Sequence, residues 1–488
     1  MKRQDTVIDC VRTLIEDGKL SCYSTPSGKS YVDVKTEGRP LKQYGLDDKE
    51  LTMAIKELLD SEGKTFPYSC YGELSNELEY MAYKNRLEYD LYKRCAYVKK
   101  KYLYDLDAEN GRIISIKNGE IYEGDTPGKV FSRTKTFKSQ VYPDWETDSS
   151  ELPFLLGKHM NLDEEYLLLI SIYLVCAFLG CKINVPILVL TGEKGSAKTT
   201  ILRMLEKLLD PKVTDLGGAP RSVSDFEISL NNNYFYVLDN LSDKSISRRL
   251  SDVLCRSVTG GTATRRKLYS NAEETVLNLK CIVAINGVTP VIHESDLADR
   301  ILMIKTQRLD ETVIVTDEEL EESFKADIPS ILGCVFQLIA EVLVDDEPIK
   351  VQRKTRLAAF FTYAVKVGRA LGYADDVVAE LLWKNQRLVN EQSLSENPVA
   401  VCVMELMRDR EEFQSSVSEL LGELKVIAEK NHIHLSLLPS QPNVLSRRLN
   451  TIKSNLQNKN IYYNIRNIGS FRQIKIYKKK RNKKGKRK

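Results

Sequence analysis

Residues Ile187–Thr200 read ILVLTGEKGSAKTT, in which an apolar strand runs directly into a short glycine-containing turn. In that order the small residues let backbone N–H groups converge, and the N-terminus of the following helix adds a positive dipole. The pattern predicts a phosphate-binding loop, in which Lys198 reaches the β- and γ-phosphates and the Thr199 hydroxyl binds Mg²⁺. The expected ligand is therefore a nucleoside triphosphate with its metal ion.

The loop departs from the common G-x-x-x-x-G-K-[ST] pattern at one position, because Ala197 stands where glycine is expected before the lysine. The alternative is an ordinary strand–turn–helix that binds nothing. The two remaining glycines and the amphipathic sequence ILRMLEKLLD that follows favour the phosphate-binding interpretation. The residues expected to bind the nucleotide are Gly192, Glu193, Lys194, Gly195, Ser196, Ala197, Lys198, Thr199 and Thr200.

Charge is unevenly distributed along the chain. The 488 residues have a net charge of +4, yet nine of the last eleven, KKKRNKKGKRK, are Lys or Arg. The rest of the chain is therefore mildly acidic, and an acidic body with a basic tail is typical of proteins that bind nucleic acid.

Composition argues against a secreted, zinc-binding or membrane protein. The ten cysteines form no C-x-x-C pair and there are four histidines, which indicates a reducing, cytoplasmic compartment. No apolar segment follows the first residues, MKRQD, so no signal peptide is expected. The longest apolar run, residues 166–180, is too short to span a membrane and predicts a buried helix.

Four segments are predicted from the pattern of helices and strands. Residues 1–150 look like a small α+β domain, with a hairpin that turns at Pro26–Gly28. Residues 151–395 alternate between helix and strand, as an α/β core with a parallel sheet requires, and end in helices. Residues 396–477 show three helices followed by two strands, the order of a winged helix-turn-helix domain. Residues 478–488 are too charged to be buried and are expected to be disordered.

Two further buried strands end in polar residues. Asp239 follows YFYVL and is expected in the Mg²⁺ shell, the alternative being a strand-end capping residue. Asn240 stands where nucleotide hydrolases usually place the acid that activates water; it can orient a water but cannot take its proton. Either the base lies elsewhere, with Asp243 nearby, or hydrolysis is slow without a partner. Asn286 follows CIVAI and would sense the γ-phosphate, although Asn-Gly alone is simply a turn.

A turn and three cations lie between these strands. Gly260-Gly261 leads into Arg265, Arg266 and Lys267, and a strand then returns to the core. This pattern favours a hairpin that points into a pore and contacts the phosphates of a DNA strand. The alternative is a solvated charge cluster.

Arg300 ends the sequence DLADR, immediately before the apolar strand ILMI. An arginine at this position commonly completes the active site of a neighbouring subunit by stabilising charge on the transferring phosphoryl group. The alternative is a surface salt bridge to Asp296 or Asp299.

These motifs resemble a known family. GEKGSAKT, YVLDN, GGTATRRKLYSNAEETV, CIVAING and DLADRILMI, in this order, resemble the helicase domain of phage and mobile-element replication proteins. That domain belongs to the AAA+ class, close to superfamily 3 and minichromosome-maintenance helicases. The resemblance covers about residues 85–478 and is most specific over 187–309. The most similar group that we can suggest is the replication initiator helicases of staphylococcal pathogenicity islands.

The resemblance implies a P-loop AAA+ core in a ring-forming, hexameric 3′→5′ DNA helicase that loads itself at a replication origin. In such a motor Lys198, Thr199 and Asp239 would hold MgATP, Arg300 would act in trans, and residues 265–267 would grip single-stranded DNA. RLAAFFTYAVKVGRALG resembles the lid helix of that family, which would make Arg356 a second sensor. The residues so assigned to ATP hydrolysis are Lys198, Asp239, Asn240, Asn286, Arg300 and Arg356.

The predicted winged helix leaves two interpretations open. Arg447 and Arg448 on its third helix, together with the basic tail, favour origin binding, but such domains also mediate protein contacts. For the whole chain, one alternative to the helicase is an ATP-dependent loader that binds DNA and recruits a host helicase. Another is a non-enzymatic origin-binding protein whose nucleotide is structural.

Overall fold

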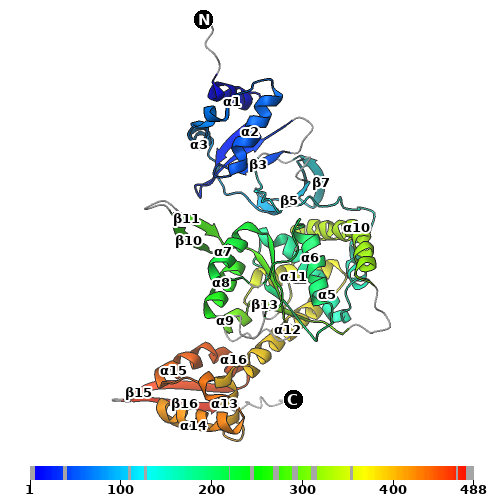
Figure 1. Ribbon diagram of the computed structural model, residues 1–488. Coiled ribbons are helices and arrows are strands. Elements are labelled where there is room, and N and C mark those ends of the chain that lie inside the picture. Colours follow the sequence, from blue (N-terminus) through cyan, green and yellow to red (C-terminus); the bar gives the residue numbers. More distant parts are fainter. Residues whose placement is uncertain are drawn as a thin grey trace.

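The computed structural model describes residues 6–36, 41–107, 111–125, 129–218, 220–241, 247–266, 274–287, 295–308, 316–351, 355–468 and 471–479. Figure 1 shows three parts in sequence order, with a central α/β part between a smaller N-terminal part and a smaller C-terminal part. The mixed α/β class expected from the sequence is confirmed, and the central sheet is parallel.

The first element group is a small α+β unit with its own apolar core. The hairpin predicted at residues 20–36 is confirmed, since its two strands pair in antiparallel register. Helix α1 starts at a capping box formed by Thr6 and Asp9 and buries Val7, Val11 and Leu14 on one face. The elements of this unit are α1 Val7–Glu16, β1 Leu20–Ser24, β2 Ser30–Val34, β3 Lys42–Gly45, α2 Lys49–Ser61 and α3 Leu74–Lys84.

A second antiparallel sheet follows, and one of its two buried faces belongs to the central core. Tyr102, Tyr104 and Ile114 pack in the same apolar cluster as the helices and strands after residue 151. The other face packs in a small cluster with Leu103 and Ile113, so the predicted segment 1–150 is divided among three apolar clusters. The sheet has the order β4-β5-β6-β7, with bounds β4 Cys95–Val98, β5 Lys101–Asp107, β6 Arg112–Lys117 and β7 Glu120–Asp125.

The central parallel sheet has the strand order β13-β8-β12-β9. Side chains alternate along each strand, so Leu188 and Leu190 face one apolar cluster while Ile187 and Val189 face another. Burial on both faces explains why these strands appear in the sequence as continuous apolar runs. Their bounds are β8 Ile187–Thr191, β9 Phe235–Leu238, β12 Ile282–Gly287 and β13 Ile301–Lys305.

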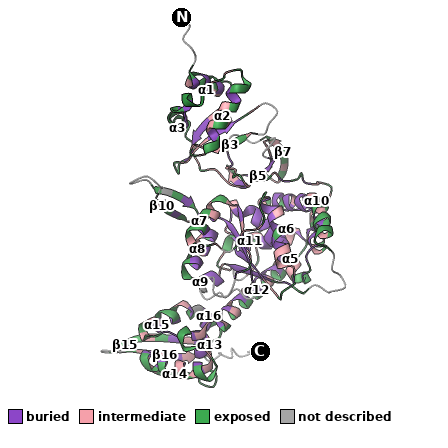
Figure 2. Cartoon of the chain, in the orientation of Figure 1, coloured by how far each residue is buried: buried purple, intermediate pink, exposed green. Residues whose placement is uncertain are grey.

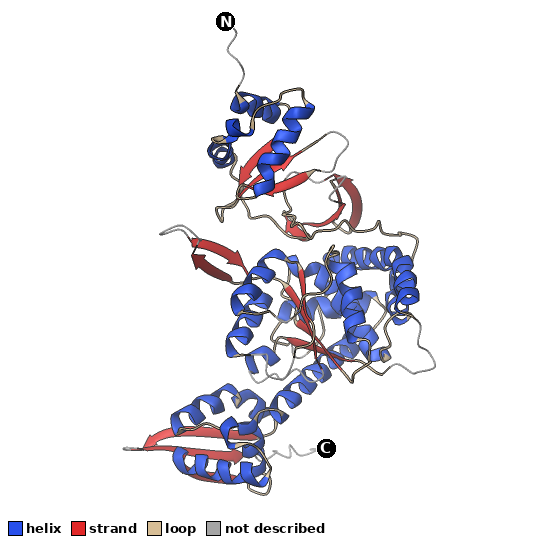
Figure 3. Ribbon diagram, in the orientation of Figure 1, coloured by secondary structure: helices blue, strands red, loops and turns tan. Residues whose placement is uncertain are grey.

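Helices cover this sheet, and one hairpin projects from the central part (Figure 3). The helices in one cluster with Leu188 include α4 Leu152–Gly157, α5 Glu164–Phe178, α6 Lys198–Leu209, α10 Asp317–Val344 and α11 Ala358–Ala370. Those with residues in the other cluster include α7 Val223–Asn232, α8 Arg248–Thr259, α9 Ser295–Ala298 and α12 Asp375–Ser395. The hairpin consists of β10 Thr262–Arg266 and β11 Glu274–Asn278.

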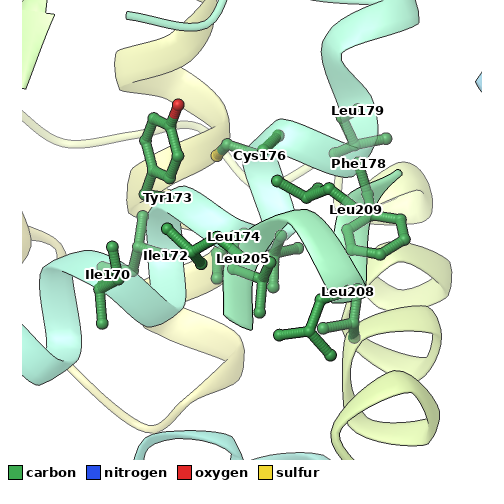
Figure 4. Close-up of a cluster of buried hydrophobic side chains, with 14 of the residues drawn as sticks. Ile170, Ile172, Tyr173, Leu174, Cys176, Phe178, Leu179, Leu205, Leu208 and Leu209 are labelled. Carbon is green, nitrogen blue, oxygen red and sulfur yellow. The ribbon is translucent and has the colours of Figure 1, made fainter. Parts of the chain in front are cut away.

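In the part of the chain that the structure describes, two segments are long and apolar enough to cross a membrane: α5 with the turn that follows it, Glu164–Cys181, and α10. The first is longer than the sequence had indicated. Their apolar windows are 72% and 61% buried inside the protein, respectively, as core helices are. Figure 4 shows α5 side chains, among them Leu174 and Phe178, lying against Leu205, Leu208 and Leu209 of α6. The buried helix predicted at residues 166–180 is thus confirmed, and Figure 2 shows its burial within the central part.

The C-terminal part has a third core and a three-stranded sheet of order β14-β16-β15. The sequence predicted two strands and missed β14, because EFQSS is short and polar and shows no strand pattern of its own. It becomes a strand by pairing with β16 far along the chain. The elements are α13 Pro398–Leu406, β14 Glu412–Ser416, α14 Val417–Lys430, α15 Pro442–Thr451, α16 Lys453–Asn458, β15 Ile461–Ile468 and β16 Phe471–Lys478.

Candidate functional site

Three predicted site residues meet where the parallel strands end. Thr199, in the first turn of α6, donates a hydrogen bond through its hydroxyl to Asp239 Oδ1 at 3.1 Å. The same hydroxyl accepts from Asn286 Nδ2, also at 3.1 Å. Asn286 is 1% exposed, so its amide is buried at the C-terminal end of β12. Carboxyl ends of adjacent parallel strands are where open α/β sheets bind ligands, because the following loops diverge there.

Asn286 also fixes the chain after β9. Its Oδ1 accepts from the backbone N–H of Asn240 at 2.7 Å, and its carbonyl oxygen accepts from Leu241 N. Asn240 has φ +56°, in the left-handed region that asparagine tolerates better than most residues. Asp239 supplies the one carboxylate in this chain of hydrogen bonds, and Asp243 lies outside the described residues.

Lys198 lies over the loop that precedes it. Its Nζ donates to the carbonyl oxygens of Gly192 at 2.8 Å and Glu193 at 2.6 Å, and to Ser196 Oγ at 3.1 Å. Burial lowers the pKa of Lys198 from its usual value because it disfavours the ammonium form. The cation is thus positioned at the loop by weak acceptors that an anion can replace.

The loop is attached to the end of β13 through a residue that sequence reasoning missed. Thr306 Oγ1 lies 2.7 Å from Ser196 Oγ and donates to Thr191 O at 3.1 Å. A Cβ on Gly192 would lie 2.4 Å from Thr306 Oγ1, so only glycine fits. The sequence pattern could have identified Thr306, because this residue follows an apolar strand as Asp239 and Asn286 do.

The unusual Ala197 has φ +54°, the left-handed conformation that glycine adopts without strain. We expect Ala197→Gly to raise the free energy of unfolding by about 1 kcal/mol, measured by denaturant titration. The matched variant is Gly195→Ala, where φ is +79° and no atom lies within 4 Å of the added Cβ. It should lower stability by about the same amount, and shifts in the same direction for both variants would contradict backbone strain as the cause.

The other predicted loop residues differ in accessibility. Glu193, Lys194 and Gly195 are exposed at the turn, and Ser196 is buried. Thr200 borders a cleft of about 700 Å³ beside α6, together with Arg203 of α6 and Asp317 of α10.

Arg300 lies at the N-terminal ends of the parallel strands, whereas the loop lies at their C-terminal ends. Its carbonyl oxygen accepts from Ile187 N at 2.8 Å, where β8 and β13 begin. Its guanidinium pairs with Asp296 at 2.6 Å, so the salt bridge considered as the alternative is present. Five strand residues separate this end from the loop, roughly 16 Å at 3.3 Å per residue. The structure therefore does not bring Arg300 to Lys198 of its own chain.

Arg356 shares the carboxylate that holds Arg300. Its Nη1 lies 2.5 Å from Asp296 Oδ1 and 3.4 Å from Asp299 Oδ2. Burial raises the pKa of Asp296, but the hydrogen bond and charge of Arg300, followed by Arg356, outweigh burial and lower it. The two predicted arginines therefore lie together, and both are remote from the loop.

The predicted DNA-binding hairpin is only partly described. Arg265 donates to Glu227 Oε2 at 2.7 Å and to Ser224 O, which ties β10 to α7. Arg266 ends β10, its side chain lies outside the described residues, and so does the whole of Lys267. In the C-terminal part, Arg447 is exposed on α15, while Arg448 Nη1 donates to Leu437 O at 2.6 Å.

Comparison with solved structures finds a long but weak similarity. One apo structure of the NrS-1 C-terminal region, in its A form, has 15% identity over 97% of this chain and 100% of that chain, with a TM-score of 0.42. Another apo structure of the same region has 14% identity, 98% and 100% coverage and a TM-score of 0.43. No curated protein matches the chain.

Two family models match successive segments of the chain. Residues 155–377 match the actinomycete integrative conjugative element replication protein model, and residues 399–486 match the AICE RepA C-terminal domain model. The prediction of a mobile-element replication protein is thereby confirmed, and the models name actinomycete elements where the sequence had suggested staphylococcal islands. Both models describe replication proteins of actinomycete integrative conjugative elements, and the chain is similar to that family over residues 155–377 and 399–486.

Proposed function

We propose that this replication protein is an ATP-driven DNA helicase that assembles at the element's origin in the cytoplasm. The observation that carries the proposal is the hydrogen-bonded group Thr199, Asp239 and Asn286 at the sheet edge beside the Lys198 loop. P-loop AAA+ motors bind ATP with a glycine-containing loop, a lysine, a hydroxyl, a carboxylate and a polar sensor residue. Residues of these types lie close together at this end of the sheet. The hexameric ring and 3′→5′ direction are carried over from the family resemblance alone.

The residues at the strand ends fit MgATP. The Thr199 hydroxyl and the Asp239 carboxylate are hard oxygen ligands 3.1 Å apart, and Mg²⁺ commonly takes one or two protein oxygens beside phosphates and waters. When bound, the ion would neutralise charge on the phosphates. Lys198 would exchange its loop carbonyls for phosphate oxygens, and Asn286 would orient Thr199 while its carbonyl fixes the backbone after Asp239.

In this motor the C-terminal part would be a winged helix that reads origin DNA. Its third helix, α15, presents the exposed Arg447, and phosphate contacts from the basic tail would add salt-sensitive affinity. Arg265 and its neighbours would contact the strand in the ring.

The test is unwinding of a forked duplex with ATP and Mg²⁺. We expect the wild type to unwind it and Lys198→Ala to lose at least about a hundredfold of both unwinding and ATP turnover, because the phosphates lose a cation that would stabilise them in the transition state. The control is Lys207→Ala, a lysine on the same helix that pairs at the surface with Glu321. It should keep the wild-type rate.

The second candidate, the ATP-dependent loader, is favoured by Asn240, which occupies the position of the acid that activates water. Turnover of ATP and binding of DNA without strand separation by the wild type would favour this candidate over the helicase. The third possibility, a structural nucleotide, would be contradicted by ATP turnover that single-stranded DNA stimulates.

A further inference from the structure

One face of the C-terminal sheet is open. Pairing places Tyr462 opposite Tyr477 and Asn464 opposite Lys475, while Tyr463 lies opposite Ile476 on the other face. Tyr463 and Ile476 are buried in the apolar core with α13, α14 and α15. On the first face no residue is buried among those described with their side chains, and Asn464 and Arg466 are exposed. We call this first face the open face; its strands are red in Figure 3.

Aromatic rings and cations gather on the open face. The rings of Tyr462 and Tyr477 stack at 5.8 Å between centroids and 24° between planes. Lys479 Nζ lies 4.2 Å from the centroid of the Tyr462 ring. Lys475, next along the same face, pairs with Glu412 of β14 at 2.7 Å. The cations Arg466, Lys475 and Lys479 thus outnumber the one carboxylate of Glu412.

We propose that the open face binds a segment of single-stranded nucleic acid, with bases on the tyrosine rings and phosphates on the cations. Rings beside cations on a sheet are how proteins hold unpaired bases, because every base has a face that stacks. A duplex would offer its phosphates but not the faces of its bases, since these are already stacked. The occupant is therefore a single strand.

This surface is separate from the helix proposed to read duplex DNA. The hydroxyl of Tyr463, on the opposite face of the sheet, donates to Asn450 of α15 at 2.8 Å, so α15 packs behind the open face. The C-terminal part could then hold duplex on one side and a melted strand on the other. Binding of a single strand to the open face would require neither ATP nor the proposed motor.

The experiment uses the full chain without nucleotide and measures fluorescence anisotropy of labelled oligo(dT) and of a duplex of equal length. Tyr462→Leu combined with Tyr477→Leu should weaken binding of oligo(dT) about tenfold or more. Binding of duplex should stay unchanged. The matched variant, Tyr462→Phe with Tyr477→Phe, keeps both rings and should bind as the wild type does.

The salt dependence of oligo(dT) affinity distinguishes the contribution of the tyrosine rings from that of the cations. The leucine variant should keep the slope of log affinity against log salt, whereas Arg466→Gln with Lys479→Gln should reduce it by about 0.7 for each lost phosphate contact. Unfolding curves check that the C-terminal core, which these outward side chains do not enter, is intact. Unchanged oligo(dT) binding in the leucine variant, or an equal loss for duplex, would overturn the proposal.

Discussion

Arg300→Ala is expected to lower ATP hydrolysis by roughly 10³–10⁵-fold while ATP still binds. Arg300 lies at the start of β13, at the end of the strands opposite to Lys198 of its own chain. It could therefore stabilise a transition state only on a neighbouring chain. Turnover and binding of a fluorescent ATP analogue would be measured side by side. The control is Arg387→Ala, an exposed arginine that pairs with Glu380 on α12.

Mixing two inactive variants tests whether the arginine acts between subunits. Arg300→Ala chains keep an intact loop, and Lys198→Ala chains keep an intact arginine, so the proposed ring would contain some complete sites when the two are mixed. Partial recovery of ATP turnover in the mixture is the expected result. If the mixture is as inactive as its components although both variants assemble, Arg300 does not complete a neighbour's site.

Arg94→Met is expected to lower the free energy of unfolding by about 4 kcal/mol, because buried acceptors lose their donor. Arg94 is 0% exposed, and its guanidinium lies 3.7 Å from the Phe137 ring centroid. It donates to Asp210 Oδ1 at 3.2 Å and to the carbonyl oxygens of Asp105, Lys138 and Pro211. Denaturant unfolding of the whole chain would measure the loss, which a surface variant such as Arg408→Met should not show.

Because the pKa of Asp210 is lowered in the folded protein, this loss in the free energy of unfolding should depend on pH. Burial raises the pKa of Asp210, but Lys212 and Arg94 outweigh burial and lower it. Since the folded value lies below the unfolded value of about 3.9, the carboxylate stabilises the protein above that pH and less so on acidification. The difference between wild type and Arg94→Met should therefore shrink below about pH 4. A difference that stays constant with pH would show that the carbonyl contacts alone account for it.

The parallel core was predictable because its information is local. Each strand is a continuous apolar run, and the residue that ends it, such as Asp239 or Asn286, lies at a common edge once the strands are parallel. The hairpin at residues 20–36 was equally local, since its turn residues lie between its two strands.

What the sequence could not show depends on distant partners. The pairing of Arg356 with Asp296, the carboxylate that also binds Arg300, joins residues on either side of β13. Strand β14 is polar and exists through its register with β16. The contribution of β5 and β6 to the central core was hidden for the same reason, because apolar residues on a strand do not reveal which helix covers them.

That shared core sets where the protein can be divided. A chain beginning at residue 151 would leave α5 without Tyr102, Tyr104 and Ile114, and would expose an apolar surface that invites aggregation. The smallest form of the central part that keeps this core intact therefore starts upstream of Arg94 and includes the sheet β4–β7. Residues 7–82 have a core of their own, but hydrogen bonds of Gln43 with Phe131 and Arg133 join them to the chain that follows.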